Sequence, residues 1–197
     1  MNSREQILHD LRKSAPQAVP LPSIPTGIIY PDPVTQFEEM FTSVGGNCLR
    51  VPDNTALLDE LAKLEVYAKA KIVASLVPGI ESRGMDPMAI TDPHDLAALD
   101  IAILPAEFGV AENGAVWIPG STLGPERAVF VIAQYVVLIL SMSQIVSNMH
   151  QAYDRVQIER PGFGLFLCGP SKTADIEQSL VIGAHGARSC NLFLVGS

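Results

Sequence analysis

Short apolar runs alternate with amphipathic segments along most of the chain. Apolar stretches rich in β-branched residues predict strands at residues 47–51, 71–77, 101–104, 134–140, 163–168 and 191–195. Between them, apolar residues at helical spacing and polar capping residues predict helices at 35–44, 54–64, from 93 onward, 143–156 and 173–182. Strands that alternate with helices need crossover connections. The expected fold is therefore α/β, with a mainly parallel sheet flanked by helices.

One segment departs from this alternation and predicts an antiparallel hairpin. Asn113-Gly114 lies between two apolar arms within residues 108–118. Asn-Gly is the preferred pair for a two-residue type I′ turn, because both central positions of that turn need a positive φ. We therefore expect a β-hairpin inserted in the α/β pattern.

The first 33 residues differ in character from the rest. Residues 3–13 place Ile7, Leu8 and Leu11 on one face of a short amphipathic helix. Six prolines follow between residues 15 and 33, and because proline fixes φ and lacks a backbone donor, this part is expected to be an extended strap. The predicted domains are the helix and strap, 1–33, and an α/β domain, 34–197. A homo-oligomer with exchanged arms is one option for such a strap.

The composition of the 197 residues excludes several classes of protein. With 48% hydrophobic and 17% charged residues, the chain is too apolar to stay disordered. It carries 13 Lys and Arg against 21 Asp and Glu, and a formal charge of −8 repels phosphate backbones, so nucleic-acid binding is not expected. The apolar stretch 128–140 is too short for a membrane span and contains Gln134, so a buried core element is expected there.

The cysteines and histidines show no metal-binding pattern. Cys48, Cys168 and Cys190 are too far apart in the sequence for a CxxC pair, so this chain is not expected to hold an iron–sulfur cluster or a structural zinc. The four histidines form no HxH or HExxH motif, so no metal site is expected. The sparse cysteines and an N-terminus without an apolar signal region favour a reducing, cytoplasmic location.

The most distinctive segment follows the predicted strand 163–168. A strand, a glycine-containing turn and a new helix would place free N–H groups and a positive dipole end at the carboxyl edge of the sheet, where open α/β sheets bind ligands. Its hydroxyls and lysine favour a carboxylate or phosphate. The candidate anion-binding residues are Gly169, Ser171, Lys172, Thr173 and Asp175. The alternative is structural: Ser171 or Thr173 caps the helix, while Asp175 and Glu177 complement its dipole.

A second polar group, His185 and Arg188, lies in the glycine-rich turn after that helix. These side chains could hold an anion, and His185 is a candidate catalytic residue for proton transfer. The same residues fit a helix C-cap with favourable cations equally well. Because a ten-residue helix spans about 15 Å, one small ligand is not expected to contact both polar groups.

Glu112 precedes the Asn-Gly turn and is the second candidate catalytic residue. A carboxylate on a rigid hairpin tip can act as a nucleophile or as a general base. The sequence shows no partner for it, and a solvated turn residue explains the same position.

Three motifs follow one another in the sequence: Phe108-Gly-Val-Ala-Glu-Asn-Gly, Gly169-Pro-Ser-Lys-Thr-Ala-Asp-Ile-Glu and Gly183-Ala-His-Gly-Ala-Arg. Together they resemble the lactate-utilization protein C family, which carries the LUD domain. The chain departs from that family at Ala187, where members commonly have proline, and at Asn113-Gly114-Ala115, where many have Thr-Gly-Thr. Besides the candidates above, the motif residues are Phe108, Gly109, Asn113, Gly114, Glu177, Gly186 and Arg188.

The resemblance implies a fold similar to that of ribose-5-phosphate isomerase, glucosamine-6-phosphate deaminase and the CoA transferases. It also implies a part in oxidising L-lactate to pyruvate beside partner proteins that carry iron–sulfur clusters. On this interpretation the chain itself binds no cofactor, its small-molecule partner is a carboxylate such as lactate, and it works in the cytoplasm. The resemblance leaves open whether the chain is itself catalytic or only a subunit of the complex.

Two alternatives belong to other classes of protein. Ala111-Glu-Asn-Gly114 resembles the Ser-Glu-Asn-Gly signature of CoA transferases, with alanine in place of the serine. Glu112 would then be a nucleophile that forms a thioester with CoA. The other alternative is a small-anion or phosphate-binding enzyme that resembles formyltetrahydrofolate cyclo-ligase.

Overall fold

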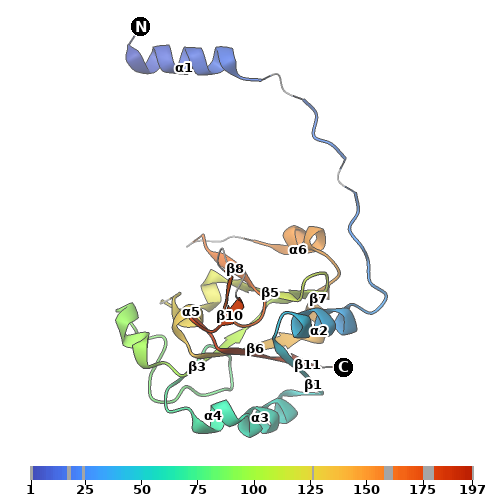
Figure 1. Cartoon of the computed structure of the whole chain (residues 1–197), viewed down its shortest axis with the longest axis vertical. Helices are drawn as coiled ribbons and strands as arrows, with labels where there is room; N and C mark the ends of the chain where they lie inside the picture. The colour runs from blue at the N-terminus through green and yellow to red at the C-terminus, as the bar shows by residue number, and fades with distance from the viewer. Residues whose placement is uncertain are drawn as a thin grey trace.

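A five-stranded parallel sheet forms the centre of the protein (Figure 1). The computed structural model describes residues 2–16, 19–23, 25–125, 127–157, 162–174 and 180–196. In spatial order the strands are β1 (Asn47–Val51), β11 (Ser189–Val195), β6 (Tyr135–Ser141), β3 (Ile101–Pro105) and β2 (Val73–Ser75). Each lies within or overlaps a predicted strand, so the expected α/β fold with a mainly parallel sheet is confirmed.

A smaller mixed sheet packs on one face of the central sheet. Its spatial order is β7 (Ile145–Val146), β4 (Phe108–Val110), β5 (Ala115–Pro119) and β8 (Gly164–Leu167). The pair β4–β5 is the expected antiparallel hairpin, but the two-residue type I′ turn is wrong. Val110 pairs with Ala115, so the loop has four residues. The reason is tertiary: the N–H groups of Ala111 and Glu112 donate to the carbonyls of Val146 and Ser147 at 2.8 and 3.0 Å, which draws the loop along β7.

The helices that the structure describes after the strap are α2 (Pro33–Ser43), α3 (Asn54–Lys63), α4 (Glu65–Lys69), α5 (Val129–Ile132) and α6 (Met149–Arg155), with 3₁₀ helices at Pro93–Ala98, Gly120–Thr122 and Met142–Gln144. The predicted helices 35–44 and 54–64 and the one from 93 onward are present with small changes in their bounds, whereas α4, α5 and the 3₁₀ helix Gly120–Thr122 were not predicted. The predicted helix 143–156 is correct only from Met149. Ile145 and Val146 instead pair with β4, and Asn148 then caps the helix by accepting from the Gln151 N–H at 3.0 Å.

The predicted helix 173–182 is wrong where the structure describes it. Lys172–Ala174 forms β9 and Leu180–Ile182 forms β10, and the two pair as an antiparallel ladder. Residues 175–179, with the candidate residues Asp175 and Glu177, lie outside the described residues. The β-branched side chains of Thr173, Val181 and Ile182 suit a strand better than a helix, and here strand pairing overrides the helical spacing.

The central sheet is covered on both faces by apolar side chains. On one face, Leu57 and Leu61 of α3 pack on alternate residues of the sheet, such as Ile103 and Phe193. On the other face, Phe37 and Phe41 of α2 pack with residues of opposite parity, such as Leu138, and with the smaller sheet. This is the two-sided burial expected of parallel strands. The outer face of the smaller sheet carries a third cluster, formed by Phe108, Val110, Trp117, Val146 and Ala152.

The N-terminal helix α1 (Ser3–Ser14) is present as predicted, and none of its residues is buried. In Figure 1 it lies apart from the sheets at the end of an extended strap. The strap is held near its C-terminal end, where the Ile28 carbonyl accepts from Asn148 Nδ2 at 2.9 Å and the Tyr30 N–H donates to Ser147 Oγ at 3.2 Å. The division into 1–33 and 34–197 stays a prediction. In the part of the chain that the structure describes, no helix is long and apolar enough to cross a membrane.

Candidate functional site

The structure brings the two glycine-rich turns together. The Ser171 N–H donates to the Ala187 carbonyl, and the Gly183 N–H donates to the Ser171 carbonyl, both at 2.9 Å. A Cβ at Gly186 would lie 3.0 Å from Ser171 Oγ, so glycine permits this close approach. The expected 15 Å separation between His185 and the Gly169–Ser171 turn is therefore wrong, because β9 and β10 form a ladder that returns the chain to its starting point.

The two turns enclose a pocket of about 200 Å³. Its polar side chains come from Ser171 and His185, and the remaining lining is Phe130, Val131, Val136, Leu167, Gly169, Pro170, Gly186 and Ala187. Val136 and Ala187 lie at the amino ends of β6 and β11, so this pocket is at the opposite edge of the sheet from the one expected. Lys172 and Arg188 are exposed and do not line it. Anion binding at Gly169–Thr173 was expected because a helix dipole would point at the anion, and among the described residues no helix begins near Thr173. Anion binding there stays a prediction.

The motif residues at the tip of the β4–β5 hairpin make contacts that stabilise the fold. The Met149 N–H, which is free of helical bonding at the start of α6, donates to Glu112 Oε2 at 2.8 Å. The Asn113 carbonyl accepts from Cys168 Sγ at 3.1 Å, and the Asn113 side chain accepts from the Ala115 N–H at 3.0 Å. A Cβ at Gly109 would lie 2.7 Å from Leu140 Cδ2, so this motif glycine is required for packing between the sheets. Glu112 therefore caps a helix, and the described residues place no activating base on its carboxylate.

We expect Glu112→Ala to lower the free energy of unfolding by about 1 kcal/mol, since one charge-assisted bond to a helix N-terminus is lost. Urea denaturation measures this change. Glu39→Ala is the matched control, because Glu39 is an exposed helical glutamate without a described hydrogen bond. We also expect no CoA adduct on Glu112 in intact-mass spectra after incubation with an acyl-CoA. An adduct at Glu112 would establish the CoA-transferase chemistry instead.

Of the three cysteine thiols, Cys190 is buried and Cys48 and Cys168 are half-buried. Burial raises the pKa of the Cys48 thiol to about 12 and also raises the pKa values of Cys168 and Cys190. These thiols are therefore protonated at neutral pH and are poor nucleophiles. Among the described residues, no three His, Cys, Asp or Glu side chains gather closely enough to hold a metal ion.

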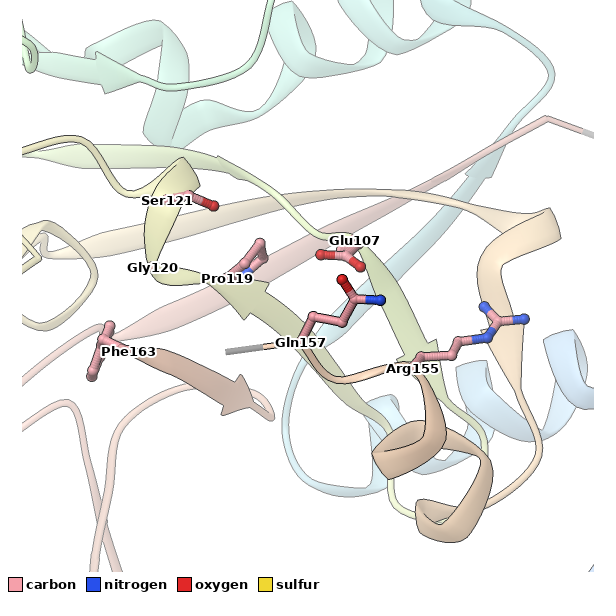
Figure 2. A pocket seen from close by; sticks show the side chains of 7 residues that line it. All are labelled: Glu107, Pro119, Gly120, Ser121, Arg155, Gln157 and Phe163. Atoms are coloured by element: carbon pink, nitrogen blue, oxygen red, sulfur yellow. The ribbon is translucent and has the colours of Figure 1, made fainter. Parts of the chain in front are cut away.

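A polar pocket of about 300 Å³ lies at the carboxyl edge of the central sheet. It is lined by Glu107, Pro119, Gly120, Ser121, Arg155, Gln157 and Phe163 (Figure 2). Glu107 follows β3 by two residues, and its N–H donates to the Trp117 carbonyl at 2.9 Å, which fixes its backbone. The carboxyl ends of strands are where open α/β sheets bind ligands. This pocket therefore lies where the fold favours a functional site.

A glycine closes one wall of this polar pocket. The Gly120 N–H donates to the Phe163 carbonyl at 2.8 Å and joins the segment after β5 to the segment before β8. A Cβ at Gly120 would lie 2.4 Å from that carbonyl oxygen, so a larger residue cannot occupy the position without movement. The neighbouring Ser121 also lines an adjoining apolar groove with Leu76, Val77, Pro78, Met88 and Pro105.

The charged groups of the polar pocket do not neutralise each other. Figure 2 shows the side chains of Glu107 and Gln157 pointing toward one another, while the Arg155 guanidinium extends away from them. Arg155 Nη1 donates to Gln144 Oε1 at 3.4 Å, and its Cζ lies 6.0 Å from the centre of the Phe108 ring. Within the described residues, neither Glu107 nor Arg155 belongs to an ion pair. No charged group of the described residues therefore competes with a ligand for either side chain.

Sequence reasoning missed this polar pocket. Its charged residues come from the end of β3 and from the end of α6, and no short motif joins them. One signal was present: Glu107 comes soon after the buried strand 101–105, at the edge where ligands are expected.

Comparison with known proteins shows similarity along most of the chain. A sequence model of the LUD domain matches residues 92–195. Lactate utilization protein C of Shouchella clausii is 36% identical over 93 residues, which are 44% of this chain and 40% of that protein. The namesake from Halalkalibacterium halodurans is 34% identical over 98 residues, 46% of this chain and 42% of that protein. The matched stretches thus span less than half of these two relatives.

Two matches from Deinococcus radiodurans, one in sequence and one in structure, cover more of the chain. Its lactate utilization protein C is 27% identical over 189 residues, covering 93% of this chain and 89% of that protein. The crystal structure of a DUF162 family protein from the same species superposes with a TM-score of 0.61 and 18% identity, covering 83% of this chain and 96% of the other. At that identity the superposition shows a shared fold.

Proposed function

The chain belongs to the LUD domain family, and from this premise we propose that it is a component of a lactate utilization system that oxidises L-lactate to pyruvate with iron–sulfur partner proteins. The observation that carries the proposal is the match to the Deinococcus lactate utilization protein C, which extends over 93% of this chain and 89% of that protein. The motifs around Glu112, Ser171 and His185 support the same assignment by their resemblance to the family.

Oxidation of L-lactate releases two electrons and two protons as the alcohol carbon becomes a carbonyl carbon. The proposal gives the electrons to clusters on the partner proteins, because redox cofactors carry such chemistry while the protein binds and orients the substrate. This chain then contributes a surface or pocket to the assembly, which the proposal places in the cytoplasm.

We expect the purified chain to be colourless and to reduce no dye when L-lactate is added. Mixed with its iron–sulfur partners, it should give lactate-dependent dye reduction and pyruvate. The partners without this chain are the control and should show little activity. Robust lactate turnover by the isolated chain would contradict the subunit assignment, and full turnover by the partners alone would contradict the need for this chain.

The two other functions have weaker support. The Glu112 carboxylate is used at the start of α6, so no observation favours a covalent thioester with CoA. Likewise, no described feature favours a phosphate-binding enzyme similar to formyltetrahydrofolate cyclo-ligase, since the helix N-terminus expected near Thr173 is a strand.

A further inference from the structure

The polar pocket of Figure 2 offers three kinds of contact to a small ligand. Arg155 provides a guanidinium, which matches a carboxylate in geometry and charge. Glu107 provides a carboxylate, which only accepts hydrogen bonds while it is ionised. Pro119 and Phe163 provide apolar surface. A ligand that satisfies all three carries a carboxylate, a donor group and a short apolar end.

We infer that this pocket binds a small 2-hydroxycarboxylate, with its carboxylate on Arg155 and its hydroxyl donating to Glu107. The inference rests on the proposed function, which makes L-lactate the first ligand to test. Lactate has the required groups on three neighbouring carbons: a carboxylate, a hydroxyl and a methyl. A pocket of about 300 Å³ has room for a ligand of this size with accompanying water.

The separation of the two charges supports this assignment. If Arg155 and Glu107 had a purely structural role, we would expect them to form an ion pair. These two side chains form no ion pair with each other. Both are exposed, so they keep their hydration until a ligand arrives. Among the described residues, the Arg155 guanidinium has a long bond to a neutral amide and lies over the Phe108 ring, and exposed side chains change rotamer within nanoseconds. Arg155 is therefore free to turn from Gln144 toward a carboxylate in the pocket.

Glu107 is the group that determines specificity in this arrangement. A hydroxyl donates to its carboxylate, whereas the carbonyl oxygen of a 2-oxo acid only accepts and would face a negative charge. Lactate should thus bind more tightly than pyruvate by about five- to a hundredfold, since the carbonyl of pyruvate leaves the Glu107 carboxylate without a donor. A site that favours the hydroxy acid over its oxidised product would also help pyruvate to leave.

The test is titration calorimetry of the full chain with L-lactate, pyruvate and propionate, which has neither the hydroxyl nor the carbonyl. We expect Arg155→Gln to weaken lactate and pyruvate binding together, each about ten- to a hundredfold. Glu107→Gln should bring the two affinities within about threefold, because a neutral amide can donate to the carbonyl of pyruvate. Wild-type protein should bind propionate more weakly than lactate.

Arg83→Gln is the matched control, because Arg83 also lies over an aromatic ring, 5.1 Å from the centre of Tyr67, but lines none of this pocket. It should bind all three acids like the wild type, and circular dichroism should show an intact fold in every variant. Lactate affinity unchanged by Arg155→Gln, or a lactate preference unchanged by Glu107→Gln, would overturn the inference. Absence of measurable lactate binding would overturn it too. These outcomes would overturn the binding site and not the proposed function, provided that the reconstituted assembly still needs this chain to oxidise lactate.

Discussion

Replacing Gly114 with alanine is expected to lower the free energy of unfolding by about 2 to 6 kcal/mol, the sum of backbone strain and overpacking. Gly114 has a φ of +71°, a conformation that an L side chain rarely adopts. Its added Cβ would lie 2.6 Å from the Phe41 nitrogen and 2.9 Å from the Phe41 Cα. These are backbone atoms of α2, which cannot turn aside as a side chain can. Urea denaturation of both proteins measures the effect.

Gly79→Ala is the control that separates strain from crowding. Gly79 has a similar φ of +85°, but no atom lies within 4 Å of its added Cβ. This variant should lose only the strain energy, about 1–2 kcal/mol. Equal losses in the two variants would show that the hairpin tip is not packed against α2 as described.

Phe41→Ala is expected to cost about 3 to 5 kcal/mol, because a large, fully buried ring leaves a cavity. Phe41 is 0% exposed, stacks on Phe37 with ring centres 6.0 Å apart, and fills the space over Gly46, whose added Cβ would lie 2.2 Å from the ring. The variant should melt well below the wild type in a calorimetric scan.

Leu58→Ala provides the comparison for this loss. Leu58 lies on α3 and is 46% exposed, so its truncation should cost less than about 1 kcal/mol. A similar loss at both positions would contradict the burial of Phe41 against the central sheet and the smaller sheet.

The parts of the fold that the sequence predicted well are those with strong local signals. The strand β1 begins and ends at the predicted residues, Asn47 and Val51. Asp53 caps α3 by accepting from the Ala56 N–H at 2.9 Å, as its residue type indicates. The alternation of such elements was sufficient to predict the parallel sheet, because crossover connections leave few other arrangements.

The errors arise where distant pairing competes with local preference. The residues on either side of 175–179 carry a helical pattern in the sequence, yet Thr173 pairs with Val181. Asn113-Gly114 favours a two-residue turn by itself, but the bonds of Ala111 and Glu112 to the β7 segment enlarge the loop. The pairing of β9 with β10, and that of the hairpin loop with the β7 segment, cannot be recognised from the local residues alone.

The candidate site shows the same limit more strongly. The motifs single out Ser171 and His185, but the two residues line one pocket only because β9 and β10 form a ladder. Glu107 and Arg155 are 48 residues apart in sequence and line one pocket only because β3 and α6 end at the same edge. Such a site follows from tertiary structure, and spacing along the chain does not reveal it.

The most direct test of the proposed function is growth of the parent organism after deletion of the gene for this chain. We predict that the deletion strain fails to grow with L-lactate as the sole carbon source, grows normally on pyruvate, and recovers on lactate when the gene is restored. Growth on L-lactate at the wild-type rate in the deletion strain would contradict a role for this protein in lactate utilization.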